Sequence, residues 1–370
     1  MLSSVLTFII VLSILVLVHE LGHYLVARKN GILAEEFGIG LPPRIWGKKI
    51  GDTIVSVNAL PFGGFVRLKG ENNEDTTDDP KRSFSSKSKR VRIAVLTAGV
   101  IMNILLGIVA FALVYSFSGI PKDTGRVKIL DISTGSPAQI ANMVVGDIVL
   151  SIDKNEVKST NDFMKYVEDK KGKKVALEIE RKVGDEKEIK KITLTPRENP
   201  PEGEGSMGVV ISTMELWYPP AWQRPFVGMY YGTKEAVFWG KTILLGLFDM
   251  VTGLFRGETP KDVAGPVGIF AVTTEVAKTG ILSLINFMGI LSVNLAILNI
   301  LPLPALDGGR VFFVALEGIV GKKVLPKVEN YVHMVGMLLL IALLILITIG
   351  DLRKLISAGS LSNFVNSMIK

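Results

Sequence analysis

The sequence predicts a polytopic α-helical membrane protein with four membrane-spanning helices and one soluble domain between the second and third of them. Two observations support this fold class. The 370-residue chain is 48% hydrophobic with a mean hydropathy of +0.40, which is high for a soluble protein. The excess lies in uncharged runs at residues 1–18, 93–121, 279–306 and 331–350. Each run can cross a hydrocarbon core about 30 Å thick as a helix.

The first apolar run ends in His19-Glu20-Leu21-Gly22-His23. Two histidines and a glutamate inside a membrane helix are expensive to insert, so they indicate a polar functional site. At helical spacing, His19 and His23 lie one turn apart on the same face. In the HExxH motif two such histidines bind zinc and the glutamate between them acts as general base. We therefore expect a Zn²⁺ site, with Glu20 as the base.

Composition argues against several other classes of protein. The chain has no cysteine, which excludes disulfides, thiolate metal ligands and a cysteine nucleophile. Two of its three histidines belong to the motif, so a serine–histidine triad has little support. The N-terminal run lacks the basic region and cleavage site of a secretory signal. The net charge is +7, but no basic stripe with interleaved aromatic residues indicates nucleic-acid binding.

Basic residues in the short connections predict the orientation in the membrane. Residues 28–92 carry thirteen Lys and Arg, and residues 307–330 carry four. The tail from residue 351 carries three and favours the opposite orientation weakly. We expect a multi-pass protein of the cytoplasmic (inner) membrane, with both termini and the central domain outside. The HExxH motif then lies toward the cytoplasmic side.

A β-hairpin is predicted after the first helix. Residues 53–60 alternate like a strand, residues 61–64 (Pro-Phe-Gly-Gly) are typical of a turn, and residues 65–68 read as a return strand. Periodicity alone favours a hairpin in the cytoplasm.

Residues 122–212 predict a small α+β domain of short strands around one or two helices. Its Gly-Ser-Pro-Ala at 135–138, followed by Gly-Asp-Ile-Val at 146–149, resembles a bacterial PDZ domain. That resemblance implies a peptide or protein ligand, and an unrelated α+β domain is the alternative. Residues 213–278 are apolar, but within 221–256 no uncharged run exceeds nine residues. Amphipathic helices lying in the membrane interface are therefore expected there.

Zinc in a hydrolase usually takes a third protein ligand. Beside the spanning segments the candidates are Asp307, His333 and side-chain amides. Asp307 follows two prolines in the run 299–309 (NILPLPALDGG), where a regular helix cannot continue. Irregular backbone at membrane depth is tolerated where it lines a cavity. Asp307 is thus the candidate ligand, with an aspartate capping the next helix as the alternative, and His333 is expected to be a residue of the membrane interface.

Taken together, these motifs resemble the site-2 protease family of intramembrane zinc metalloproteases, in its bacterial subgroup with an extracytoplasmic PDZ domain. The resemblance covers nearly the whole chain. It rests on HELGH, Gly-Ile-Gly at 38–40, Pro-Phe-Gly-Gly-Phe-Val at 61–66, Ala98-Gly99 with Asn103, Gly-Pro-Val-Gly-Ile at 265–269, and the run ending in Leu-Asp-Gly. One departure is Val100, where the family usually has proline.

The resemblance implies that Asp307 is the third zinc ligand and that the hairpin at 53–68 enters the membrane. It also implies that Asn299 hydrogen-bonds the substrate backbone or the oxyanion, and an amide that packs helices together is the equal alternative.

The function expected is hydrolysis of peptide bonds within transmembrane segments of single-span proteins, such as anti-sigma factors or remnant signal peptides. An unwound substrate could add as a strand to the hairpin at Ile54, Val55, Ser56 and Val57. A metal transporter and a catalytically inactive PDZ-bearing scaffold are the alternatives. The expected organisation is 1–121 with HExxH and the hairpin, 122–212 PDZ-like, 213–278 interfacial and 279–370 with Asp307.

Overall fold

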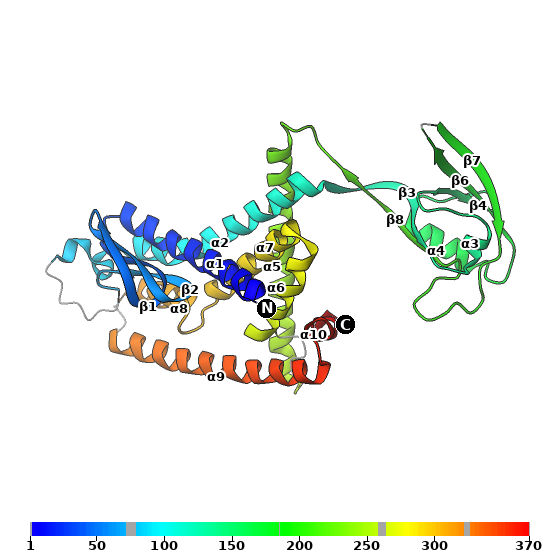
Figure 1. The fold of residues 1–370 in the computed structure, drawn as a ribbon. Coiled ribbons are helices and arrows are strands. Elements are labelled where there is room, and N and C mark those ends of the chain that lie inside the picture. Colours follow the sequence, from blue (N-terminus) through cyan, green and yellow to red (C-terminus); the bar gives the residue numbers. More distant parts are fainter. Residues whose placement is uncertain (1, 72–78, 185, 258–263, 322–325, 370) are drawn as a thin grey trace. The chain divides into compact units, whose positions relative to one another are not determined.

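The computed structural model describes residues 2–71, 79–184, 186–257, 264–321 and 326–369. The chain divides into two compact units. The first comprises Met1–Phe117 together with Pro220–Lys370, and the second comprises Ser118–Pro219. The first unit is mainly helical and the second is built on a β-sheet (Figure 1).

The helices of the first unit are α1 (Leu2–Lys29), α2 (Lys89–Ser118), α5 (Arg224–Phe255), α6 (Pro266–Thr279), α7 (Ile281–Ile300), α8 (Asp307–Val320), α9 (Pro326–Ala358) and α10 (Leu361–Ile369). Two short 3-10 turns, η1 (Pro80–Arg82) and η2 (Phe84–Ser86), precede α2. Within the described residues, α1, α2, α5, α7 and α9 are each long and apolar enough to cross a membrane. The predicted count of four spans is therefore not confirmed, because α5 is a further candidate.

Two charged residues in the first half of α5, Lys234 and Glu235, have partners nearby. Glu235 accepts hydrogen bonds from the hydroxyl of Tyr115 at 2.8 Å and from Nε1 of Trp239 at 3.0 Å. The ammonium of Lys234 lies 4.6 Å from the centre of the Tyr230 ring. Such contacts let charged side chains sit beside an apolar face without breaking the helix. The expected apolar, charge-interrupted segment at 221–256 is thus one long helix.

Helices α1 and α2 cross where glycines remove the side chains between them. A Cβ on Gly22 would overlap the carbonyl of Ala98. A Cβ on Gly99 would meet the imidazole rings of His19 and His23, coming within 2.7 Å of Nε2 of His19. Small residues commonly permit this close approach between membrane helices. The backbone of α2 thereby reaches the two imidazoles of the HExxH motif.

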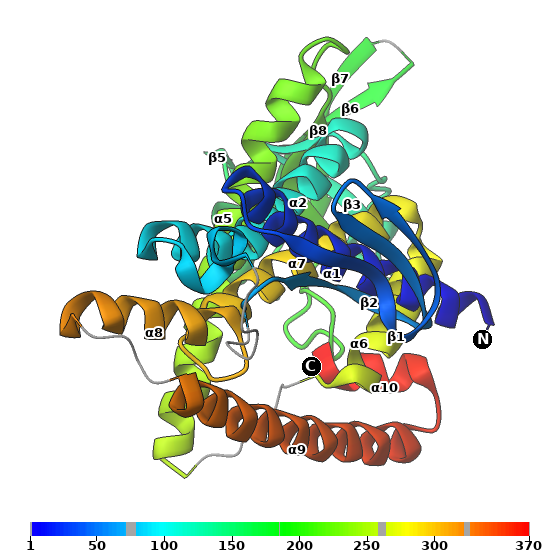
Figure 2. The ribbon, with the colours of Figure 1, turned by 90° about the vertical axis from the view of Figure 1, so that its left-hand side faces the viewer.

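The hairpin predicted at 53–68 has its turn at another place: the prediction of a turn at 61–64 is wrong. Strands β1 (Ala34–Ile50) and β2 (Thr53–Leu68) are joined at residues 51–52, and β2 continues through the expected turn at 61–64. Gly38 of β1 pairs with Phe65 and also with Ser56, so part of β1 lies between two stretches of β2. The glycines at 63–64 bend β2 rather than end it, because Gly63 adopts a φ of +70°. Figure 2 shows this β element beside α1, and β2 is the strand that contacts α1 most.

The second unit holds β3 (Ile120–Ile132), α3 (Pro137–Ile140), β4 (Ile148–Ile152), β5 (Asn155–Glu156), α4 (Thr160–Glu168), β6 (Val175–Val183), β7 (Glu186–Leu194) and β8 (Val209–Trp217). The strand order is β7-β6-β4-β3-β8, with β5 paired to β4. The hydroxyls of Ser136 and Ser159 cap α3 and α4. Asp147 is fully buried and pairs with Arg181 at 2.6 Å. An independent core of buried Val, Ile and Leu side chains holds this unit together.

Candidate metal centre

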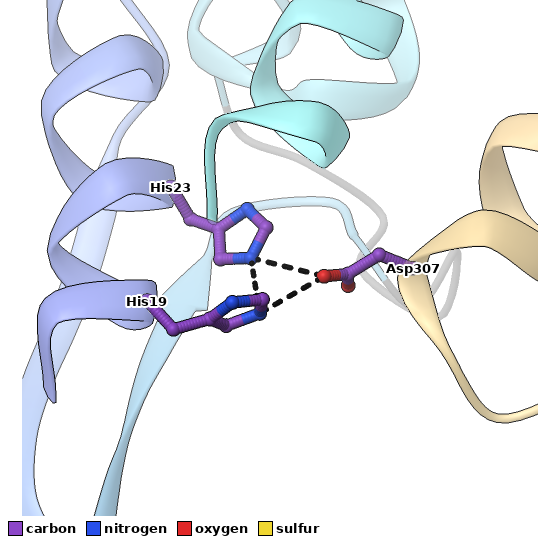
Figure 3. Close-up of side chains that lie close together, drawn as sticks. All are labelled: His19, His23 and Asp307. Carbon is purple, nitrogen blue, oxygen red and sulfur yellow. Dashed lines mark hydrogen bonds and ion pairs between the residues drawn. The ribbon is translucent and has the colours of Figure 1, made fainter. Parts of the chain in front are cut away.

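Three side chains from opposite ends of the chain meet at one point of the first unit (Figure 3). Oδ2 of Asp307 lies 3.0 Å from Nε2 of His19 and 3.3 Å from Nε2 of His23. The two Nε2 atoms are 3.1 Å apart, and both histidines are buried. Among the described residues this is the group of histidine and carboxylate side chains arranged to hold a metal ion.

Asp307 reaches the histidines because α7 ends early and the chain turns back sharply. The helix stops at Ile300, and Leu301 already has an extended backbone. The loop that follows contains both prolines, and Asp307 is the first residue of α8. Side chains at Gly308 and Gly309 would overlap the carbonyls of Ile300, Leu301 and Leu303. The two glycines therefore allow the tight return that carries Asp307 toward α1.

The hydrogen bonds of His23 leave its Nε2 atom free to bind a metal. Its Nδ1 atom lies 2.8 Å from the carbonyl of Val95, which can only accept, so Nδ1 donates. The proton of the neutral ring is then on Nδ1, and the Nε2 lone pair faces Asp307. Metal-binding histidines commonly donate their second ring N–H to an outer partner in this way.

Asn103 provides the corresponding partner for His19. Its amide nitrogen lies 3.3 Å from Nδ1 of His19, while its amide oxygen is buried and has no partner among the described residues. A half-turn of the amide places that oxygen against Nδ1, satisfies it, and leaves Nε2 of His19 with a free lone pair. Two imidazole nitrogens and one carboxylate oxygen are a donor set typical of catalytic zinc sites. The residues present therefore fit Zn²⁺.

Glu20 lies next to these ligands on α1. Its Oε2 atom accepts a hydrogen bond from the backbone N–H of Val66 in β2 at 3.0 Å. Glu20, His23 and Asp307 line a cavity of about 690 Å³. The other walls are formed by β2, α2, the loop before α8 and α9, through Phe65, Val66, Leu68, Glu71, Val95, Leu96, Ala305, Leu306, Arg310, Asn330, His333, Met334 and Met337. The carboxylate thus faces the same cavity as His23 and Asp307.

Asn299, in the last turn of α7, is also at the centre: its Nδ2 atom lies 3.4 Å from Nε2 of His19. In contrast, residues 54–57 do not line the cavity. Ser56 pairs with Gly38 on one side and Gly47 on the other, so this stretch has no free edge. The expectation that a substrate strand adds to Ile54, Val55, Ser56 and Val57 is therefore wrong. The stretch of β2 beside Glu20 is the one around Val66.

Sequence reasoning missed two residues that contact this centre. In the sequence, Asn103 is noted only for its place in the family resemblance and is given no role, although its position one turn after Gly99 puts both on the same face of α2. His333 was expected at the membrane interface, but its ring contacts the loop that carries Asp307. The spacing from Gly99 is a local signal for Asn103, whereas the contact of His333 depends on how α9 packs against the Asp307 loop and leaves no signal in the sequence.

A buried two-histidine, one-carboxylate centre with an adjacent glutamate is typical of catalytic zinc sites, and the comparisons with known proteins show which class of zinc protein this is. The model of peptidase family M50 matches residues 7–343. A Clostridium acetobutylicum protein described as a zinc metalloprotease is 37% identical over 345 residues. The alignment covers 93% of this chain and 95% of that relative. The zinc metalloprotease RasP of Geobacillus kaustophilus and the regulator of sigma-W protease RasP of Bacillus subtilis are each 30% identical over 431 residues. These alignments cover 95% of this chain and 98% and 99% of the relatives.

The chain belongs to peptidase family M50, the site-2 protease family. It is a membrane protein and a zinc metalloprotease. Among solved structures, the PDZ domain of an SdrC-like protein from Listeria monocytogenes is 28% identical, with a TM-score of 0.20. The match covers 25% of this chain and 90% of the chain of the PDZ domain.

Proposed function

We propose that this protein hydrolyses peptide bonds of transmembrane segments inside the bilayer, with His19, His23 and Asp307 as zinc ligands and Glu20 as general base. The observation that carries the proposal is the position of this centre. The histidines belong to an uncharged helix long enough to span a membrane, and the cavity beside them opens between that helix, β2 and α9.

When bound there, Zn²⁺ lowers the pKa of water toward about 7 and polarises a carbonyl oxygen. Glu20 takes the proton of the attacking water and later delivers it to the leaving nitrogen. The carbonyl of Val95 and the amide of Asn103 hold the two imidazoles in the required tautomer. Asn299, on the side of α7 that faces His19, donates its amide N–H to the oxygen that becomes negatively charged.

The β element gives an unwound substrate its hydrogen bonds. A helical segment opened in lipid leaves backbone groups unsatisfied at several kcal/mol each. A strand lying along β2 near Val66 would recover those bonds and bring its carbonyls to Glu20. This edge replaces residues 54–57 as the proposed docking strand.

The direction of the helices supports an interfacial role for α5. Asp307 follows α7 and meets His23 near the end of α1, so α1 and α7 end on the same side of the membrane. The hydroxyl of Ser116, at the end of α2, donates to the carbonyl of Arg224, so α5 begins on the opposite side. If α5 crossed, the chain would have to recross before α7. Helix α6 has only 14 residues, about 21 Å, which is too short for that.

We therefore place α5 in the interface at one side of the membrane, where Figures 1 and 2 both draw it at a steep angle to α9. Both termini and the unit Ser118–Pro219 then lie outside the cytoplasm, and the metal centre lies toward the cytoplasmic side. The outer unit is proposed to be PDZ-like and to bind a peptide or protein ligand. The substrates are proposed to be single-span proteins of the anti-sigma factor or remnant signal peptide type.

The deciding experiment incubates purified protein in lipid with a labelled single-span substrate. Wild type is expected to cleave within the span, a zinc chelator to abolish cleavage, and added Zn²⁺ to restore it. Glu20→Gln is expected to keep its zinc and lose activity. Cleavage by that variant at the wild-type rate would show that Glu20 is not the base, and zinc uptake into vesicles without cleavage would favour a transporter.

A further inference from the structure

The loop that carries Asp307 contains a residue in an unfavourable conformation. Ala305, two residues before Asp307, has a φ of +73°, the left-handed region that alanine rarely adopts. That conformation is unfavourable for an L-residue, so other contacts must hold it in place. The direction in which Asp307 points depends on this turn, because only Leu306 lies between them.

His333 of α9 makes the contact that holds the turn. The backbone N–H of Ala305 donates to Nδ1 of His333 at 2.8 Å. The same ring lies 5.7 Å from the ring of Phe313 in α8, and Cε1 lies 3.3 Å from where a Cβ of Gly309 would be. One turn further along α9, a side chain at Gly336 would overlap Pro304. The imidazole therefore lies between the loop that precedes Asp307 and helix α8, which follows that loop.

The ring is oriented by its Nδ1 atom. Because Nδ1 accepts from Ala305, the proton of the neutral ring is on Nε2. Nε2 is buried and has no partner among the described residues. A buried donor without a partner is unfavourable. The bond at Nδ1 and the packing around the ring are therefore what favour this orientation.

We propose that His333 is a positioning residue of the metal centre. By accepting the N–H of Ala305, it holds the left-handed turn that aims Asp307 at His19 and His23. The inference rests on the proposed ligand set, since it explains how the third ligand is held. His333 acts through the backbone two residues from Asp307 and does not itself bind the metal.

The test compares substitutions that keep or move the hydrogen-bond acceptor. In His333→Asn the amide oxygen takes the position of Nδ1, whereas in His333→Gln it takes the position of Nε2. His333→Phe keeps a ring and has no acceptor. The readouts are zinc retained by the purified protein against increasing chelator, thermal unfolding of the zinc-free protein, and kcat and KM for a single-span substrate.

Outer partners of metal ligands typically contribute about 10–100-fold to metal affinity. We expect His333→Phe and His333→Gln to lose zinc at chelator concentrations at least tenfold lower than wild type, with a lower kcat and little change in KM. His333→Asn should retain zinc nearly as well as wild type. Ala305→Gly, added to His333→Phe, should recover much of the loss, because glycine adopts a φ of +73° without help.

Two results would overturn the proposal. One is equal zinc retention in wild type and His333→Phe, and the other is equal loss in His333→Asn and His333→Gln, which a purely structural role predicts. Asp307→Asn separates this proposal from the ligand assignment. If that variant retains zinc as wild type does, the ligand set is wrong whatever His333 does.

Discussion

The guanidinium of Arg92 donates to the carboxylate of Glu317 at 2.7 Å, and both side chains are buried. The pair joins the first turn of α2 to α8, the helix that Asp307 begins. The ammonium of Lys89 adds a second contact, donating to the backbone carbonyl of Glu317 at 2.7 Å. These contacts fix α8 against α2, the helix that packs on His19 and His23.

Breaking this ion pair should destabilise the first unit. Glu317→Ala leaves the charge of Arg92 buried and uncompensated, a change that typically costs about 3–5 kcal/mol. We expect a clear drop in the unfolding temperature in detergent and weaker zinc retention. Exchanging the two charges, Arg92→Glu with Glu317→Arg, should recover part of the loss. Unchanged unfolding in Glu317→Ala would show that the pair does not hold α8.

Gly99 should tolerate no side chain. A Cβ there would displace the rings of His19 and His23, and misplacement by about 1 Å can cost a hundredfold in rate. We expect Gly99→Ala to reduce cleavage by about that factor and to weaken zinc retention. The matched control is Gly246→Ala in α5, where a Cβ meets nothing within 4 Å. Equal activity in the two variants would contradict the close packing of α2 on the motif.

Cleavage of a substrate that adds as a strand along β2 should depend on the backbone of Val66 rather than on its side chain. Val66→Pro removes the N–H that Glu20 accepts and interrupts strand addition, whereas Val66→Ala keeps that N–H. Cleavage of a transmembrane substrate should fall at least tenfold in the first variant and stay near wild type in the second, with zinc retained in both. A similar loss in both variants would assign the effect to side-chain packing instead.

The orientation of α5 can be tested cleanly because the chain has no native cysteine. Single cysteines at Gly246 and Phe255 of α5 should react from the extracytoplasmic side of intact cells with a membrane-impermeant reagent. A cysteine at Lys48, in β1, should react only after the membrane is opened. Reaction of Phe255→Cys only from the cytoplasmic side would mean that α5 spans the membrane.

The sequence alone was sufficient to predict the parts of the candidate site that depend on local spacing. The one-turn separation of His19 and His23 is a property of a single helix, and the prolines before Asp307 mark an irregular segment wherever it packs. The partners of these residues depend on the fold. Asn103 and His333 acquire their contacts only when α2 and α9 pack against distant segments, and strand pairing across Gly38 decided which part of β2 keeps a free edge.

The separation of His19 and His23 from Asp307 along the chain also affects how the protein is made. His19 and His23 enter the membrane first, but Asp307 is synthesised 284 residues after His23 (307 − 23). At about 5–20 residues per second, that interval is on the order of tens of seconds. Throughout it the HExxH helix lacks Asp307, so a half-made chain does not have the complete set of side chains that we propose to hold zinc. With the proposed ligand set, proteolytic competence is delayed until the last helices have packed.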